Sequence, residues 1–328
     1  MGKNTNHFQA LSIFTDKLDF IGDVHGCYYT LTDLLTQLGY KQINGVWQHP
    51  ERIAVFVGDY IDRGINIGPT LELIKNMTDN GKALAILGNH ELNLVGIFTR
   101  NEDGIPLRPH HKIKQHRATI ENLSEQELNY WIEWFKELPL FLDFGKIRTV
   151  HAAWHDKYIE IIKKQLPENK IKNALFEIFD CKTDLHKAVI YTLKGPELPI
   201  PAPILEQAQK QYMDFRLKEA RIKWWSDIPE NPTYAQATTL SKIKETIDQP
   251  LESLYKPYPS AAPIVIFGHY SMDTQPYIIR DNATCIDFGV YKKNFLAAYR
   301  YNGEDKLSEK NLIWVRHNPK DEILPPTP

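Results

Sequence analysis

Three short apolar segments of the sequence each end in a glycine that is followed at once by acidic, amide or histidine residues. The segments occupy residues 18–21, 53–57 and 83–87, and their length and apolar character are typical of buried strands. Residues 28–38 carry leucines at helical spacing, and a second helical pattern begins near Pro69. This alternation predicts right-handed crossovers and a sheet that is at least partly parallel.

The polar residues at the three strand ends fall into short motifs that contain glycine. Because open α/β sheets bind ligands at the carboxyl ends of their strands, we expect the three motifs to gather along one edge. A helix cap or a turn would explain any one motif, but neither explains the supply of Asp, His, Asn and Arg at all three. The motifs are Gly22-Asp23-Val24-His25-Gly26, Gly58-Asp59-Tyr60-Ile61-Asp62-Arg63-Gly64 and Gly88-Asn89-His90-Glu91.

The side chains of these motifs suit a site for divalent cations and phosphate. Asp23 and His25 combine a carboxylate with an imidazole, a pair that binds Mn, Fe or Zn better than Ca. The two carboxylate oxygens of Asp59 can each face a different ion. Arg63 offers a planar fork of donors that matches phosphate oxygens, although a surface ion pair would also account for it.

Two later histidines also follow predicted strands. His151 comes after residues 147–150, and His269 comes after residues 264–267 and Gly268. Either histidine alone would more often be a buried residue with satisfied hydrogen bonds than a metal ligand. Together with the three motifs they complete a ligand set for a metal centre.

The three motifs, His151 and Gly268-His269 resemble those of the phosphoprotein phosphatase branch of the calcineurin-like metallophosphoesterases. The resemblance covers residues 18–155 and resumes over residues 263–302. It implies an α/β (α+β) fold with a central β-sandwich flanked by helices. This expectation replaces the doubly wound sheet that the alternation of strands and helices alone would suggest.

The resemblance also implies a metal centre with two divalent ions as cofactors, Mn being the first expectation and Fe or Zn the alternatives. A hydroxide that bridges the two ions would attack the phosphorus atom. The first ion would be bound by Asp23, His25 and Asp59, and the second by Asp59, Asn89, His151 and His269.

Three further residues would act on the substrate if the resemblance holds. His90 would contact the phosphate or protonate the leaving group, and Asp62 would orient His90. Arg63 would hold phosphate oxygens together with Asn89 and His90. A second phosphate-binding arginine is expected shortly before the last metal-binding histidine. Because no arginine lies between Arg221 and His269, the role of Arg221 stays open.

Other segments leave the substrate open between three hypotheses. The first is a phosphomonoesterase of the Ser/Thr protein phosphatase type, whose partner would be a phosphorylated protein, and residues 225–227 (Trp-Ser-Asp) resemble that group. The alternative is a bis(5'-nucleosyl)-tetraphosphatase or another nucleotide phosphohydrolase, because residues 286–290 and 296–298 look more like bacterial relatives, which include diadenosine tetraphosphatases as well as small protein phosphatases. A remote alternative is a non-catalytic binding module on the same fold.

We expect a single domain over residues 1–328, with its core at 18–155 and 263–316. Residues 156–260 carry helical patterns broken by prolines and are predicted to form an inserted helical cap, and residues 319–328 a mobile tail. Segments 277–279, 285–286 and 295–299 are expected to form an antiparallel series of strands. Trp224 and Trp225 in the cap belong either to the core or to a stacking surface for a base or a peptide.

Composition excludes several other classes of protein. The net charge of −2 gives no strong nucleic-acid signal and no attraction to an anionic membrane. Three scattered cysteines indicate a reducing compartment, and no apolar run approaches the roughly 20 residues of a membrane helix. With polar residues at positions 1–10, these features favour a cytoplasmic protein; the oligomeric state stays undetermined. His110, His111 and His116 lie among basic residues and are expected to form a solvated loop.

Overall fold

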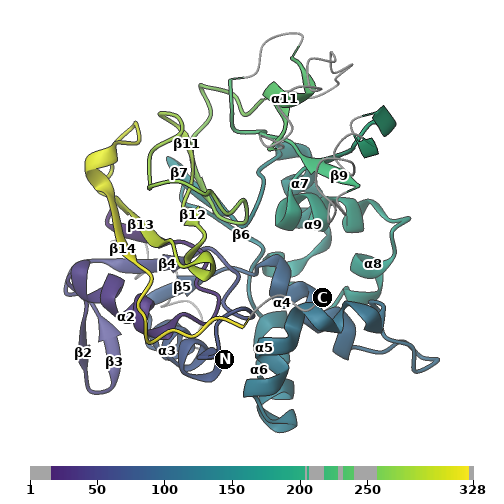
Figure 1. The fold of residues 1–328 in the computed structure, drawn as a ribbon, viewed down its shortest axis with the longest axis horizontal. Helices are drawn as coiled ribbons and strands as arrows, with labels where there is room; N and C mark the ends of the chain where they lie inside the picture. Colours follow the sequence, from purple (N-terminus) through teal and green to yellow (C-terminus); the bar gives the residue numbers. More distant parts are fainter. Residues whose placement is uncertain (1–15, 204, 207–217, 228–231, 240–256, 325–328) are drawn as a thin grey trace.

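The computed structural model describes residues 16–203, 205–206, 218–227, 232–239 and 257–324. Two large sheets form its centre (Figure 1). The first has the order β12-β13-β1-β4-β5, with β14 also paired to β13, and the second has the order β11-β10-β7-β6. The strands of the first sheet are β1 (Leu18–Ile21), β4 (Ile53–Phe56), β5 (Ala83–Ala85), β12 (Asp287–Phe288), β13 (Phe295–Tyr301) and β14 (Leu312–Arg316). Those of the second are β6 (Phe141–Asp143), β7 (Ile147–Val150), β10 (Ile264–Phe267) and β11 (Ala283–Cys285).

Each sheet mixes parallel and antiparallel pairs. Strand β4 is parallel to β1 and to β5, with Val55 opposite Phe20 and Leu84, so the predicted parallel character is confirmed. Of the expected antiparallel series, segment 295–299 is correct, since it lies in β13, which is antiparallel to β1, β12 and β14. The series is wrong for β11, which is parallel to β10, and residues 277–279 form no strand. Segment 268–282 between β10 and β11 is long enough for the crossover that a parallel pair requires.

Alternate residues of the strands pack on the two faces of each sheet. Phe20, Val55 and Ile266 belong to a cluster that joins side chains of both sheets. The next residues along the same strands, such as Ile21 and Phe56, belong to a second cluster that contains the helices. Because side chains in a strand alternate with a period of two, one strand serves both cores. The two sheets therefore form the expected sandwich.

Helices cover the outer faces of the sandwich (Figure 1). Helix α2 packs on β13 and β14, and α3 packs on β5. Helix α6 begins with the predicted capping box of Ser124 and Glu127. Within the described residues, no helix combines the length and the apolar character needed to cross a membrane. The helices outside the insert are α2 (Tyr28–Gln37), α3 (Ile67–Asp79), α4 (Asn89–Phe98), α5 (Arg117–Asn122) and α6 (Glu125–Lys136), with the 3-10 helices η1 (His110–His116), η3 (Val290–Lys292) and η4 (Glu309–Asn311).

The insert after β7 is helical only in its first part. There the structure has α7 (Asp156–Gln165), η2 (Pro167–Asn169), α8 (Leu175–Phe179) and α9 (Asp184–Lys194). Beyond them, β8 (Glu197–Pro199) and β9 (Glu219–Arg221) form a small antiparallel sheet, which precedes α11 (Tyr234–Ala237). The expectation of a purely helical cap is therefore wrong for this part, because prolines from position 196 onward interrupt helical hydrogen bonding. Residues 204, 207–217, 228–231 and 240–256 of the predicted cap lie outside the described residues.

The two tryptophans of the insert are core residues. Trp224 is 1% exposed, and its indole Nε1 donates to the carbonyl oxygen of Ala152 at 3.0 Å. Trp225 is buried against Phe267 and Tyr270. Neither ring face is available to a ligand, so the stacking-surface hypothesis is wrong. The tryptophans instead fasten the insert beside the segment that follows β7.

The chain end that was expected to be a mobile tail packs against the core as far as residue 324. Asp321 is 2% exposed, and its Oδ2 accepts hydrogen bonds from the backbone nitrogen and the hydroxyl of Thr30 at 2.7 and 2.6 Å. Its Oδ1 accepts from the nitrogen of Tyr29 and from Asn66. The carboxylate thus satisfies N–H groups at the start of α2, where the helix dipole favours negative charge. Residues 325–328 lie outside the described residues.

We expect Asp321→Ala to lower the free energy of unfolding by about 2–4 kcal/mol, because buried donors of α2 lose their acceptor. Urea denaturation would measure the change. Asp281→Ala is the matched control, since this carboxylate is 70% exposed and pairs only with Lys306 at the surface; its loss should stay below about 1 kcal/mol. Equal losses in the two variants would contradict the role of Asp321.

Candidate functional site

The predicted site residues converge at the carboxyl ends of strands from both sheets. Asp23 and His25 follow β1, and Asp59 follows β4. Asn89 and His90 begin α4 after β5, while His151 follows β7 and His269 follows β10. The structure buries the side chains of the six predicted metal ligands, Asp23, His25, Asp59, Asn89, His151 and His269.

Asp59 lies at the centre of this group. Its Oδ2 is 3.8 Å from Nε2 of His25 and 3.8 Å from Nε2 of His90. Its Oδ1 is 3.3 Å from Nε2 of His151. The two oxygens of one buried carboxylate therefore face different imidazoles, which is the arrangement expected of a bridge between two ions.

A second set of donors meets on the other side of Asp59. Oδ1 of Asn89 is 3.0 Å from Nε2 of His151 and 2.6 Å from Nδ1 of His269. Asp59, His151 and His269 are close enough to hold one ion, and His25, Asp59 and His90 form another such group. Asp23 approaches from β1, where its Oδ2 accepts from the backbone nitrogen of His269 at 3.0 Å.

The chemistry of these donors fits divalent metal ions. Oδ1 of Asp23 is buried without a hydrogen-bond partner among the described residues. Burial, together with the charges of Asp287 and Asp59, raises the pKa of Asp23 well above its usual value, so a nearby cation would stabilise its ionised form. Burial also lowers the pKa of His25 to about 4 and lowers that of His269. Both imidazoles are therefore neutral near pH 7, as metal ligands must be.

Backbone carbonyls orient two of the imidazoles. Nδ1 of His25 is 2.8 Å from the carbonyl oxygen of Ile61, and Nδ1 of His151 is 2.8 Å from that of Val57. In each ring Nδ1 then donates to a carbonyl oxygen, and Nε2 is on the side of the ring that faces Asp59. Such outer contacts commonly fix the tautomer of metal-binding histidines.

Glu91 holds the second and third motifs together. Its carboxylate accepts hydrogen bonds from the backbone nitrogens of Asp59, Tyr60 and Gly88 at 3.0, 2.8 and 3.0 Å. Burial, followed by the charge of Asp59, raises the pKa of Glu91 to about 7. Glu91 belongs to the third motif, but the sequence alone suggests no role for it. Its structural role is to keep the loop that carries Asp59 in place.

The site is built from strained backbone. Several of its residues have positive φ angles, a region that side chains other than glycine rarely adopt. These angles persist only where surrounding contacts determine the conformation, and they tend to cluster at functional sites. They are 47° at His25, 54° at Asp59, 70° at Asp62, 71° at Arg63 and 71° at His269.

Two glycines are required by close approaches inside the site. A Cβ atom at Gly88 would lie 2.3 Å from Oδ1 of Asp59, and one at Gly58 would lie 2.7 Å from Nδ1 of His151. Both distances are too short for any side chain. The glycines that end the predicted strands therefore let the ligands approach one another.

Asp62 lies beside His90, as the resemblance implied. Its Oδ2 is 2.5 Å from Nδ1 of His90. Burial would lower the pKa of His90, but Asp59 and Asp62 raise it to about 9. Burial would raise the pKa of Asp62, but His116 and His90 hold it well below its usual value. His90 therefore carries a proton near neutral pH and can act as a proton donor.

The solvated-loop prediction is wrong for His116. Its side chain is 0% exposed, and its Nδ1 is 2.8 Å from Oδ2 of Asp62. Helix η1 packs against α4, which brings its last residue beneath His90. The polar composition of this segment gave no reason to expect the contact. Thr119 is a second partner of Asp62. His116 and Thr119 are three residues apart, a spacing that places two side chains on the same face of a helix. The side chains of His110 and His111 lie outside the described residues.

Two arginines flank the candidate ligands. The Arg63 guanidinium lies 5.0 Å from the ring centre of Tyr291, which in turn contacts the ring of His25. The Nε of Arg63 is buried without a hydrogen-bond partner among the described residues. Arg221 donates from Nη1 to the carbonyl oxygen of His269 at 3.2 Å. The guanidinium group of Arg63 thus lies on the His25 side of the cluster and that of Arg221 on the His269 side.

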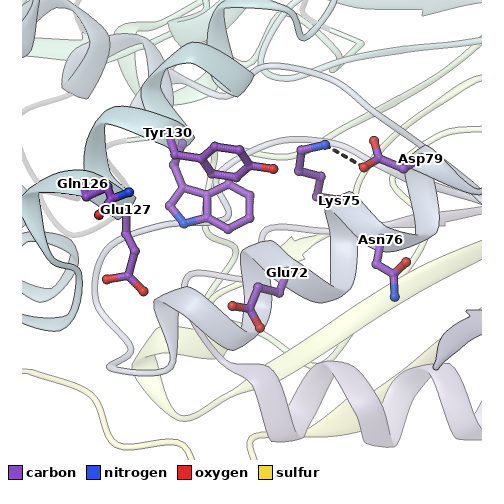
Figure 2. Close-up of a pocket in the computed structure, with 8 residues that line it drawn as sticks. Glu72, Lys75, Asn76, Asp79, Gln126, Glu127 and Tyr130 are labelled. Carbon is purple, nitrogen blue, oxygen red and sulfur yellow. Dashed lines mark hydrogen bonds and ion pairs between the residues drawn. The ribbon is translucent and has the colours of Figure 1, made fainter.

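A separate groove of 560 Å³ lies between α3 and α6 (Figure 2). Its lining includes three carboxylates, Glu72, Asp79 and Glu127, and its lysine, Lys75, is paired with Asp79 at 2.6 Å. None of its lining residues is a candidate metal ligand. A phosphate-bearing substrate would be repelled there, so the groove does not compete with the buried cluster as the phosphate site.

Residues 17–271 match the model of a family described as calcineurin-like phosphoesterase. Among curated proteins, the asymmetrical bis(5'-nucleosyl)-tetraphosphatase PrpE of Oceanobacillus iheyensis is 35% identical over 141 residues, 42% of this chain and 55% of that protein. The symmetrical bis(5'-nucleosyl)-tetraphosphatase of a Marinomonas species is 30% identical over 166 residues, 48% of this chain and 53% of that protein. The chain thus spans little more than half the length of these relatives.

A solved structure is similar over most of the chain. It is the cold-active protein-tyrosine phosphatase of a psychrophilic Shewanella species, which is 15% identical and has a TM-score of 0.49. The match covers 94% of this chain and 80% of that protein.

We expect the purified protein, stripped with a chelator and then dialysed against Mn²⁺, to retain about two ions per chain. Asp59→Asn should lose most of this metal, because the neutral amide cannot supply an anionic oxygen to each ion. Elemental analysis would measure the content. Asp273→Asn, which changes a surface carboxylate paired with Lys292, is the control. Full retention of metal by Asp59→Asn would refute the bridging role.

Proposed function

The chain belongs to the calcineurin-like phosphoesterase family, as its three motifs predicted, and we propose that it is a metal-dependent hydrolase of bis(5'-nucleosyl) tetraphosphates. The observation that carries the reaction class is the Asp59 carboxylate, whose two oxygens face separate groups of imidazoles. The substrate rests on different support, which is the tetraphosphatase names of the curated relatives. That support favours the nucleotide hypothesis over a phosphorylated protein.

The candidate ligands would hold two divalent ions, which would neutralise charge on the phosphoryl oxygens and lower the pKa of a water molecule, so that hydroxide is available near neutral pH to attack phosphorus. They are Asp23, His25, Asp59, Asn89, His151 and His269. All six are buried, so their charges and dipoles act with little screening by water.

His90 is the proposed proton donor to the leaving group. Its Nδ1 is engaged by Asp62, so the proton to be transferred is on Nε2, on the side of the ring that faces Asp59. When the bond between phosphorus and the leaving oxygen breaks, that oxygen takes the Nε2 proton. Asp62 stabilises the imidazolium before transfer and keeps the ring in one orientation.

The arginines support a substrate with several phosphates. Arg63 lies near His25, and Arg221 lies near His269. A polyphosphate chain that crosses the site would meet both guanidinium groups. Guanidinium groups bind phosphate oxygens with paired hydrogen bonds, so the two arginines would hold the phosphates on either side of the bond that is cleaved.

Turnover of three substrates by the full chain with Mn²⁺ would test this proposal. We expect kcat/KM for diadenosine tetraphosphate to exceed that for a phosphothreonine peptide and for p-nitrophenyl phosphate by at least about tenfold, a difference of roughly 1.4 kcal/mol in transition-state binding. Chromatography of the products identifies the phosphorus attacked, since ATP plus AMP indicates asymmetrical cleavage and ADP alone indicates symmetrical cleavage. Turnover confined to the phosphopeptide would instead favour the protein phosphatase hypothesis.

Asp59→Asn should reduce turnover of the best substrate by at least about 1,000-fold, because it removes charge stabilisation of the transition state. Asp273→Asn should stay close to the wild type. If the wild type, loaded with metal, hydrolyses none of the three substrates, the hydrolase proposal fails and a binding module on the same fold becomes the better explanation.

A further inference from the structure

A chain of three side chains, the half-buried His90 and the buried Asp62 and His116, extends from the candidate metal centre to η1. We propose that His116 is a positioning residue, which locks Asp62 so that Asp62 in turn holds His90 with its Nε2 proton toward the leaving group. The inference rests on the proposed hydrolase function. It gives a role to a histidine that none of the three motifs contains.

The hydrogen bonds around His116 define where its proton lies. Nε2 of Gln115 donates to Nε2 of His116 at 2.7 Å. Because that ring nitrogen accepts, the proton of the neutral imidazole is on Nδ1. Nδ1 lies 2.8 Å from Oδ2 of Asp62, so the N–H group of His116 stands against the carboxylate, although its direction is not that of a well-formed hydrogen bond.

With His116 in place, Asp62 has a donor on each side. Oδ2 lies 2.5 Å from Nδ1 of His90 and 2.8 Å from Nδ1 of His116. Oδ1 accepts from the hydroxyl of Thr119 at 2.6 Å, and the backbone nitrogen of Asp62 donates back to that hydroxyl at 3.1 Å. These contacts leave the carboxylate one orientation. Without His116, one of its three side-chain donors is lost and the carboxylate can rotate, which releases His90.

The same three residues are close enough to hold a cation, but their protons argue against one. A metal ion would need the Nδ1 lone pair of His116, and that nitrogen carries the proton because Gln115 occupies Nε2. The partners of His116 are Asp62 and Gln115, neither of which is a candidate metal ligand. Replacement of His116 should therefore leave the metal content unchanged.

If His116 supports proton donation, the rate lost on its replacement should depend on the basicity of the leaving group, whereas a general loss of folding would lower all rates alike. A proton donor matters most when the leaving oxygen is strongly basic, and little when that oxygen leaves readily as an anion. Misplacement of His90 should therefore slow substrates with poor leaving groups selectively. A merely structural role for His116 would slow good and poor leaving groups alike.

The test compares His116→Leu with His116→Asn, whose side chains have the same branching. The asparagine amide can donate to Asp62 from near the position of Nδ1, and leucine cannot. We expect His116→Leu to lower kcat for phenyl phosphate about 10–100-fold and for 2,4-dinitrophenyl phosphate less than about threefold. KM and Mn²⁺ content should remain near wild-type values, and His116→Asn should recover most of the lost rate. His116→Gln, whose amide reaches only the Nε2 position, replaces His116→Leu if that variant does not fold.

The possible failures are distinguishable. Equal losses on both esters, or no recovery in His116→Asn, would overturn the role of His116 and leave the proposed function intact. No hydrolysis of either ester or of diadenosine tetraphosphate by the wild type would overturn the proposed function, and the role of His116 with it. Loss of Mn²⁺ in His116→Leu would show that the residue acts on the metal centre instead.

Discussion

Everything at the site depends on the burial of several carboxylates in one small volume. A buried carboxylate is very unfavourable unless hydrogen bonds or cations compensate for the water it loses. Each group finds a different compensation. Glu91 accepts hydrogen bonds from backbone N–H groups, and Asp287 accepts them from the backbone nitrogens of Ser271 and Gly289. Asp62 lies against imidazole rings and accepts a hydrogen bond from a hydroxyl. Asp23 and Asp59 lie beside the candidate imidazole ligands, and divalent ions would compensate for the burial of these two carboxylates.

The fold supplies the rigidity that such a site needs. Strained residues with positive φ, among them Asp59 and His269, require surroundings that leave them no alternative. Both sheets of the sandwich end at the site, so its two halves are attached to one packed core. The insert reinforces one half through Trp224 and Ala152. The C-terminal segment reinforces the other, since the backbone nitrogen of Leu324 donates to the carbonyl oxygen of Arg63 at 2.8 Å.

The residues around the cluster come from segments that are distant from one another in the chain, and each segment contributes a different kind of residue. The candidate metal ligands follow the strand ends, the proposed proton donor His90 lies at the start of α4, and His116, which contacts Asp62, is the last residue of η1. Arg221 reaches the site from the small sheet of the insert. Under the proposed function, segments added to the sandwich would bear on substrate choice and proton transfer, while the sandwich itself presents the candidate metal ligands.

The amino-acid sequence by itself predicted the strands, the glycines that end them and the candidate ligands. Each of these features is a short pattern of residues that are adjacent in the chain, so it can be recognised without knowledge of the tertiary structure. It also indicated the sandwich, through a family resemblance that the match over residues 17–271 confirms. Only the tertiary structure decided that β11 is parallel to β10, that Asp321 caps α2 and that His116 is buried against Asp62. These three features depend either on a partner that is distant in the chain or on which face of a polar segment packs against the core. A short stretch of sequence specifies neither.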